Sequence, residues 1–280
     1  MLDTVAFVQT RAGVPALATI NALADTHVTV LNSGAAMGVP TPCTKIAATL
    51  FVSNTATSGK VNGVQIRTPS LGQMASLDFA NYVANSAGSE IPGDEPPMDL
   101  FFDNPIPLLG GEALSVYTTN TGTNNESDDC VVFLTDGLFG VPLTLNALGQ
   151  YVDSNGNVLR VQPILFNWSQ TLTAHAWTAA TLNPSQQLAQ GTYICIGAKV
   201  SSATGIAARF IFQNSTSTNR PGVPCVASLA NTVDPALAKF RMGRLGLFGT
   251  FSYQSIPQME ILASAADTSG QALLDLVKIA

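Results

Sequence analysis

The sequence predicts an all-β protein built from two similar units, and three features of the chain support this. Short apolar runs recur along the 280 residues, and clusters of Gly, Pro, Asn and Ser separate them. Such punctuation is typical of many short strands. Long stretches with helical periodicity are rare. Asn-Gly pairs, the strongest short-range signal of a tight hairpin, occur at Asn62-Gly63 and Asn155-Gly156.

The predicted strands are apolar runs of strand length, several of which alternate between apolar and polar residues. In the run from Ala113 to Thr118, for example, Leu114 and Val116 share one face, and Ser115 and Tyr117 share the other. The full set is His27–Leu31, Thr44–Ser53, Val61–Arg67, Met98–Phe102, Ala113–Thr118, Cys130–Leu134, Val158–Phe166, Ala174–Ala179, Thr192–Val200, Ala207–Gln213, Leu245–Tyr253 and Gln258–Ala263.

These strands divide into two β-rich units, which we place at residues 27–140 and 158–263. A connector of residues 141–157 joins them and ends in the Asn155-Gly156 turn. Residues 1–26 form an N-terminal arm, and residues 264–280 form a C-terminal helix or tail. A weak internal echo, in which Asn-Pro pairs and phenylalanines recur at one spacing, gives mild support to two similar units.

Short helices are predicted at three places, in loops and at the C-terminus. Asn183 to Leu188 opens with an Asn cap and a Pro at the first helical position. A second candidate is a short helical turn at Pro235–Phe240. The stretch from Asp267 to Val277 reads as a C-terminal helix outside the main fold.

The chain is unusually poor in charge, which bears on what it can bind. Only 11% of its residues are charged, whereas 46% are hydrophobic, and the net charge is −6. Typical soluble domains carry roughly 25% charged residues. No apolar run approaches the ~18 residues of a spanning helix. A surface of Thr, Ser, Asn and Gln is suited to being covered by neighbours, which indicates a subunit of an assembly. Basic residues are scattered, which argues against a direct grip on nucleic acid.

The four cysteines are predicted to be buried free thiols, with one or two disulfides as the alternative. They are Cys43, Cys130, Cys195 and Cys225, and none forms a CxxC pair. Zinc is not indicated, because both the spacing and companion histidines are missing. The N-terminus lacks the pattern of a signal peptide, so we expect synthesis in a cytoplasm.

No catalytic or cofactor-binding constellation is predicted, and we expect no enzyme activity. His27 and His175 lack metal-ligand spacing, and no GxSxG elbow is present. The pairs Asp94-Glu95 and Asp128-Asp129 are interpreted as solvated loop charges. Structural calcium at the acidic loop before Cys130 is the alternative. The stretch Asp153–Asn157 resembles the start of a calcium loop but lacks a downstream Glu, so a hairpin is favoured.

Glycines, tryptophans and arginines have structural interpretations. Gly243, Gly246 and Gly249 match no nucleotide-binding motif and are expected to permit close strand approach. The two tryptophans, Trp168 and Trp177, are expected in the core or at a subunit interface. The candidate interface residues are Arg220, Arg241 and Arg244, because arginine is enriched in interfaces; intramolecular pairing is the equal alternative.

In this organisation the chain resembles the double jelly-roll major capsid proteins of tailless icosahedral viruses, especially bacteriophages. The resemblance covers residues 27–263 and rests on the strand pattern, the segment Pro105–Leu114 and the run Leu245–Phe251. It implies two eight-stranded sandwiches in tandem, homotrimers with a pseudo-hexagonal outline, and a virion shell around an internal membrane or genome. Copies of itself and other virion proteins are then the partners, and the end segments tie neighbouring capsomers. A single elaborated jelly roll is the alternative.

Two other function classes share parts of this pattern. A receptor- or glycan-binding spike or fibre protein of a virion would also be β-rich and poor in charge. A β-sandwich hydrolase would use loop carboxylates such as Asp94 or Asp128. The assembly subunit is favoured over both, because no residue pattern demands a ligand or a reaction.

Overall fold

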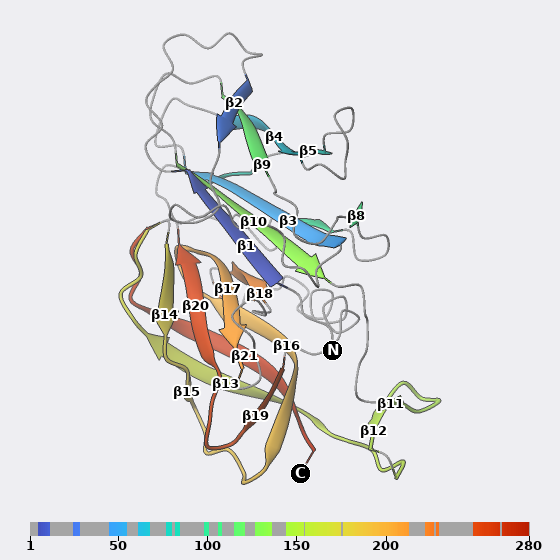
Figure 1. Ribbon diagram of the computed structural model, residues 1–280. Helices are drawn as coiled ribbons and strands as arrows, with labels where there is room; N and C mark the ends of the chain where they lie inside the picture. The colour runs from blue at the N-terminus through green and yellow to red at the C-terminus, as the bar shows by residue number, and fades with distance from the viewer. Residues whose placement is uncertain are drawn as a thin grey trace.

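The computed structural model describes part of the chain. Up to residue 143 it describes mainly the backbone of the strands. From residue 144 to 279 it describes the chain, except residues 154, 175, 213–221, 227, 230–248 and 264. All regular structure in these residues is strand, and they contain no helix (Figure 1). The predicted all-β fold is therefore confirmed for the described residues.

The second half of the chain forms a sheet that curls into two facing layers (Figure 1). One layer pairs its strands in the order β13-β21-β16-β19, and the short β15 adds to β13. The other layer has the order β14-β20-β17-β18. The bounds are β13 Val161–Ser169, β14 Trp177–Ala180, β15 Asn183–Pro184, β16 Thr192–Ser201, β17 Gly205–Ile211, β18 Gly222–Val226, β19 Gly249–Ser252, β20 Gln258–Ala263 and β21 Ser269–Lys278.

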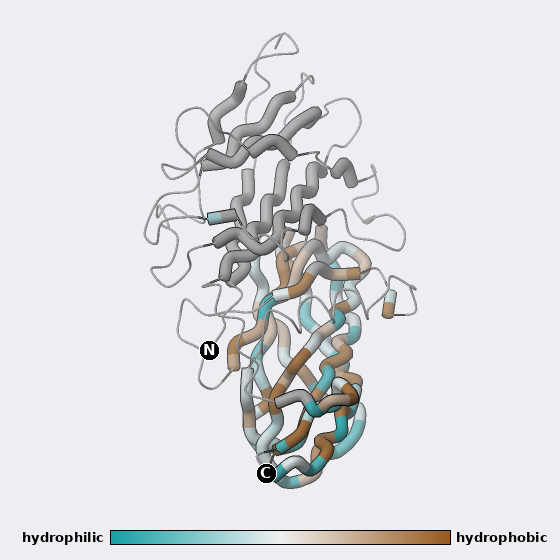
Figure 2. Tube along the Cα trace, turned by 90° about the vertical axis from the view of Figure 1, so that its right-hand side faces the viewer, coloured by the Kyte–Doolittle hydropathy of each residue, from teal (hydrophilic) through white to brown (hydrophobic). Residues whose placement is uncertain are grey.

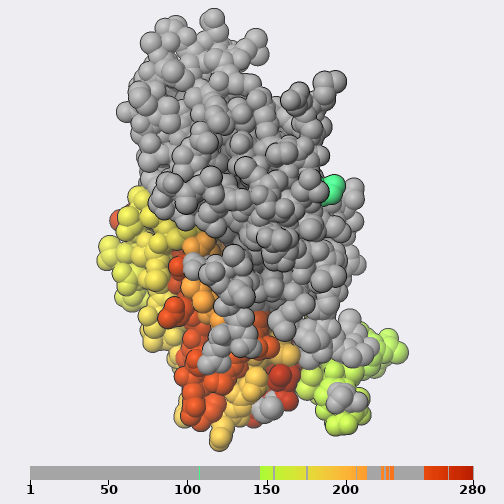
Figure 3. Space-filling model, in the orientation of Figure 1, coloured from blue at the N-terminus to red at the C-terminus, as the bar shows by residue number. Residues whose placement is uncertain are grey.

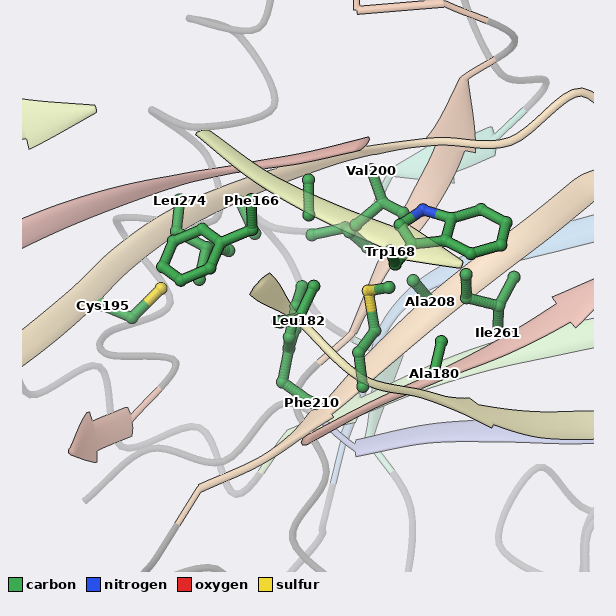
Figure 4. Close-up of a cluster of buried hydrophobic side chains, with 14 of the residues drawn as sticks. Phe166, Trp168, Ala180, Leu182, Cys195, Val200, Ala208, Phe210, Ile261 and Leu274 are labelled. Carbon is green, nitrogen blue, oxygen red and sulfur yellow. The ribbon is translucent and has the colours of Figure 1, made fainter. Parts of the chain in front are cut away.

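Alternation of side chains along these strands builds a core between the two layers. On β13, Ile164, Phe166 and Trp168 are buried, while their neighbours are exposed or half-buried. All three belong to one core cluster with Phe210 and Ile261 of the opposite layer, and Figure 4 shows Phe166 and Trp168 within it. Hydrophobic and hydrophilic positions alternate along the coloured strands of Figure 2. A stack of large apolar side chains between two layers therefore holds this β-sandwich together.

Pro163 lies within the long strand β13, where a missing N–H would normally break the sheet. The Leu165 carbonyl accepts a hydrogen bond of 2.8 Å from the Ser185 N–H, so Leu165 directs its backbone groups away from β21. Pro163, two residues earlier, has the same orientation. Its nitrogen therefore lies at the open edge of β13, where proline costs no ladder bond and discourages pairing with another chain.

The first half of the chain contains two further sheets. One has the order β1-β10-β3-β6, with β7 and β8 also paired to β3. The other has the order β2-β9-β4-β5. The bounds are β1 Val5–Arg11, β2 Asp25–Val28, β3 Lys45–Asn54, β4 Val61–Arg67, β5 Leu77–Phe79, β6 Tyr82–Ala84, β7 Met98–Leu100, β8 Ile106–Pro107, β9 Ser115–Asn120 and β10 Ser127–Thr135. All neighbours are antiparallel except β3 and β6.

The predicted connector is itself a hairpin of two short strands. They are β11 Thr144–Leu145 and β12 Tyr151–Val152, and an isolated bridge joins Val152 to Val158. The predicted Asn155-Gly156 turn is confirmed, because Gly156 has a φ of 81° and its N–H donates to the Asp153 carbonyl at 3.0 Å.

Two helix predictions are wrong. The segment 267–277 lies largely in β21, which pairs with both β13 and β16 in the middle of its layer. Both faces of β21 are buried over residues 274–277, so apolar residues occupy adjacent positions on either side of Asp275 and conceal the strand period. At 183–188, Asn183 and Pro184 form the edge strand β15 beside β13. The helical turn predicted at Pro235–Phe240 lies outside the described residues.

The ends of the chain also contribute strands to sheets. Residues 5–11, within the predicted N-terminal arm, form β1 and pair with β10 along their whole length. Residues 269–278, within the predicted C-terminal tail, form β21. Both segments therefore belong to sheets, and for residues 267–277 this corrects the expectation of a helix outside the main fold.

Candidate functional site

The three arginines predicted for an interface, Arg220, Arg241 and Arg244, all lie outside the described residues. The same holds for Asp94, Glu95 and His175. His27 lies in β2, opposite Tyr117 of β9.

Asp128 and Asp129 were expected at the tip of a loop, and this is wrong. They lie in β10, where Asp128 pairs with Arg11 of β1 and with Ser53 of β3. The apolar run that signals this strand begins only at Cys130, but the ladder extends three residues further towards the N-terminus. The pairing with β1 and β3 extends the strand to Ser127, and the local sequence does not reveal these partners.

A polar network at one end of the second-half sandwich is centred on Asp267. The Asp267 carboxylate accepts hydrogen bonds from the Ser202 hydroxyl and from the N–H groups of Ala203 and Thr268, the latter two at 2.8 Å. The Ser202 oxygen in turn accepts one from the Gly205 N–H at 2.9 Å. Ser202 is only 3% exposed. This serine is therefore a buried clamp of the β16–β17 turn and not an accessible nucleophile.

Replacing Asp267 by Ala should lower the free energy of unfolding by about 2–3 kcal/mol, because hydrogen bonds to a charged group are among the stronger ones. The change also leaves the buried Ser202 hydroxyl without its acceptor. Asp267→Asn keeps a carbonyl oxygen and should lose less. Urea unfolding of both variants measures the difference. Equal losses would mean that the oxygen kept in Asp267→Asn accepts no stabilising hydrogen bond, which would contradict the network.

A second polar cluster lies across β14, β17 and β20. The Arg209 side chain pairs with Glu260, its direct neighbour on β20. The Arg209 guanidinium also lies 4.2 Å from the ring centroid of Trp177. Trp177 is half-buried, whereas Trp168 is in the core. The expectation of a core position is thus confirmed for Trp168, and Trp177 instead supports an arginine by a cation–π contact.

Two of the four cysteines lie in the described part of the second half, and both are buried free thiols as predicted. They are Cys195 and Cys225. Burial raises the pKa of both thiols well above its usual range, so both stay protonated. Cys43 lies outside the described residues, and Cys130 lies in β10.

Gly249 shows the close approach expected of the glycines near this point in the sequence. A Cβ atom at Gly249 would overlap the ring of Phe212. Phe212 in turn contacts Phe251 across a 6.3 Å centroid distance. Gly243 and Gly246 lie outside the described residues.

The connector contains two turns of the same build. In the first, the Asn146 N–H donates to Gln150 O and the Gly149 N–H donates to Asn146 O, both at 2.9 Å. In the second, the corresponding bonds join Asp153 to Asn157 and Gly156 to Asp153, both at 3.0 Å. Gly149 and Gly156 both have positive φ, at 73° and 81°. This is the three-residue hairpin loop that requires glycine in its left-handed position.

The first side chain of each turn fixes the loop from within. The Asn146 Oδ1 atom accepts from the N–H groups of Leu148 and Gln150, both at 2.9 Å. Asp153 Oδ1 accepts from Asn155 and Asn157 in the same way, both at 2.8 Å. The side-chain hydrogen bond from Asn157 is the main cause that lowers the pKa of Asp153. Both loops are therefore held in one geometry by their own polar groups.

The base of the connector is anchored on the outer face of the β16–β21 layer. Tyr151 and Leu159 pack against the buried pair Ile194 and Val277. Burial, and secondarily the charge of Asp275, raises the pKa of Tyr151.

The connector carries the most exposed large apolar side chain among the described residues. The large hydrophobic residues exposed in the described part of the chain are Leu148, Val158, Val161 and Ile279. Leu148, which lies in the first turn, is 83% exposed, more than any of the other three. The hairpin that carries it protrudes from the body in Figure 3, at the lower right. The candidate functional surface is thus a protruding hairpin with one exposed leucine, Leu148, in its turn.

Metal and membrane sites receive no support from the described residues. Within them, no group of three or more His, Cys, Asp or Glu side chains is placed to hold a metal ion. Nor do they include a helix able to cross a membrane.

The described part of the chain thus defines a class, the all-β proteins with a two-layered sandwich. Comparison with known proteins gives nothing more specific: no family model, curated protein or solved structure matches the chain.

Proposed function

We propose that this chain is the structural subunit of an icosahedral virus capsid and that each half is a jelly roll. The observation that carries the proposal is the order in which the strands pair. Eight strands folded into one long hairpin pair first with eighth, second with seventh, third with sixth and fourth with fifth. Rolling that hairpin up adds the pairs eighth–third and seventh–fourth. This is the jelly roll, a fold common in viral capsid domains.

In the second half, the eight principal strands make all six of these pairs, and β16 and β18 additionally form a short parallel pair, Val200 with Cys225 and Ser201 with Val226. Setting aside the two-residue β15, the hairpin pairs are β13–β21, β14–β20, β16–β19 and β17–β18. The pairs that rolling adds are β21–β16 and β20–β17. A fold with these six pairings has the four-stranded layers that the resemblance to capsid proteins implies.

The first half repeats the order. Its hairpin pairs are β1–β10, β2–β9 and β4–β5, and the rolled pairs are β10–β3 and β9–β4. The place of the sixth strand beside β3 is shared by the short β6, β7 and β8. The first strands of the two halves, β1 and β13, begin at residues 5 and 161. The proposed repeat unit is therefore much longer than the spacing of the weak echo seen in the sequence.

The composition supports the same proposal. With 11% charged residues, the surface of the subunit is suited to burial against other copies through shape and hydrogen bonds. The capsomer is a homotrimer, assembled in the host cytoplasm and incorporated into the virion with other capsid proteins. It makes no direct sequence-specific contact with nucleic acid.

The proposal is tested by the mass of the purified chain under native conditions. Sedimentation equilibrium at micromolar concentration should give a species of three times the 29.1 kDa chain mass, or a larger assembly. A homogeneous monomer over the whole concentration range contradicts a self-assembling shell subunit.

A further inference from the structure

We propose that the hairpin of residues 144–152 is an assembly arm, whose Leu148 inserts into a pocket on a second copy of this chain. This inference rests on the proposed function, because it supplies one of the contacts by which the subunits join.

The strongest support comes from comparing the two turns of the connector. Their hydrogen bonds correspond one to one, and each begins with an Asx residue and has glycine in its fourth position. The third position is Leu148 in the first turn and Asn155 in the second, and both are exposed. The second turn therefore shows that this loop geometry does not need an apolar residue there. The exposed leucine at the first tip offers apolar area that burial against a partner would remove from water.

The arm is built to present this leucine in a fixed direction. Asn146 holds the loop through its Oδ1 atom, and its Nδ2 atom donates to Gln150 Oε1 at 3.0 Å. At the base, Tyr151 and Leu159 pack on the outer face of the sandwich. A contact residue held in place before binding loses little conformational entropy when it docks. The hydrogen bonds and packing that hold the hairpin therefore favour a role for Leu148 in binding a partner.

The chemistry of the arm favours a protein partner. Between residues 144 and 160 the only ionisable acidic and basic side chains are Asp153 and Arg160, so the segment has no net charge. Nucleic acid and anionic lipid surfaces would select clustered Lys and Arg. An uncharged hairpin with an apolar tip is instead expected to bind a protein surface that is also poor in charge. This chain has such a composition, with 11% charged residues. A second copy is therefore the partner.

The test uses the full chain and three single variants. Leu148→Asn gives the first turn the residue that the second turn carries at this position, so folding should be unchanged. Full burial of a leucine corresponds to an association about tenfold to hundredfold tighter, and Leu148→Asn should weaken self-association by that factor. Leu148→Met keeps an apolar tip and should retain association. Ala147→Ser, which copies the second turn at its neighbouring position, is the matched control.

The partner is identified by a benzophenone side chain introduced at position 148. Illumination of a mixture of ¹⁴N- and ¹⁵N-labelled chains should give cross-links between light and heavy peptides. If Leu148→Asn assembles like the unaltered chain, or if cross-links stay within one chain, the arm is refuted while the proposed function stands. If the unaltered chain is itself a monomer, both proposals fail.

Discussion

Replacing Trp168 by Ala should destabilise the second-half sandwich by about 3–5 kcal/mol, the usual cost of removing a large aromatic side chain from a core. Trp168 is 2% exposed and belongs to the hydrophobic cluster between the layers (Figure 4). Its Nε1–H also donates to the Ser201 carbonyl at 3.2 Å, which links β13 to the end of β16. The variant loses both the packing and this bond. Hydrogen exchange of the β16 and β21 amides measures the local free energy of opening.

The chain provides its own control for this substitution, since it has a second tryptophan. Trp177 is half-buried, and its contact with Arg209 is worth about 0.5–1 kcal/mol at a partly exposed site. Trp177→Ala should therefore cost far less than Trp168→Ala. Similar losses for the two variants would contradict the assignment of Trp168 to the core.

Replacing Gly270 by Val should also destabilise the second-half sandwich strongly, because the space beside this glycine is already occupied. Gly270 pairs with Trp168 across β13 and β21. A Cβ atom there would overlap the Ser201 carbonyl oxygen and lie 2.7 Å from Trp168 Cζ2. The carbonyl is part of the β16 backbone and cannot rotate away as a flexible side chain can. Overpacking of a core costs about 1–3 kcal/mol and sometimes more, so we expect this variant to be poorly folded.

Gly270→Ala measures the same effect in a milder form, by urea unfolding followed with circular dichroism. Gly156→Ala is its control, because nothing lies within 4 Å of a Cβ atom there and only the φ of 81° is unfavourable. A left-handed alanine costs about 1–2 kcal/mol. A smaller loss for Gly270→Ala than for Gly156→Ala would contradict the close packing of Trp168 on Gly270.

The strand content of the fold could be predicted from sequence because turns and apolar runs are local signals. The run Thr192–Val200 became β16, and the Asn155-Gly156 pair became a turn. The error at β21 has a physical cause. The stretch from Asp267 was predicted as a helix, but the Asp267 carboxylate binds the β16–β17 turn, and residues 274–277 are buried on both faces. Pairing with the distant strands β13 and β16 determines that this segment is a strand, and the local sequence does not reveal these partners.

The candidate site was harder to predict, because exposure is not a property of a residue type. The sequence favoured Arg220, Arg241 and Arg244, and it gave no weight to Leu148. One signal was available: Asn146 to Gly149 repeats the Asx-to-Gly spacing of Asp153 to Gly156. The Arg209–Glu260 pair and the Asp267 network gave no such signal, since their partners lie 51 and 65 residues apart.

Electron microscopy of the self-associated full-length chain tests the central claim most directly. A subunit with two tandem jelly rolls should give closed particles of uniform diameter, built from trimeric capsomers with a pseudo-hexagonal outline. A field of dispersed single subunits, at a concentration where the chain is folded, would contradict a capsid role.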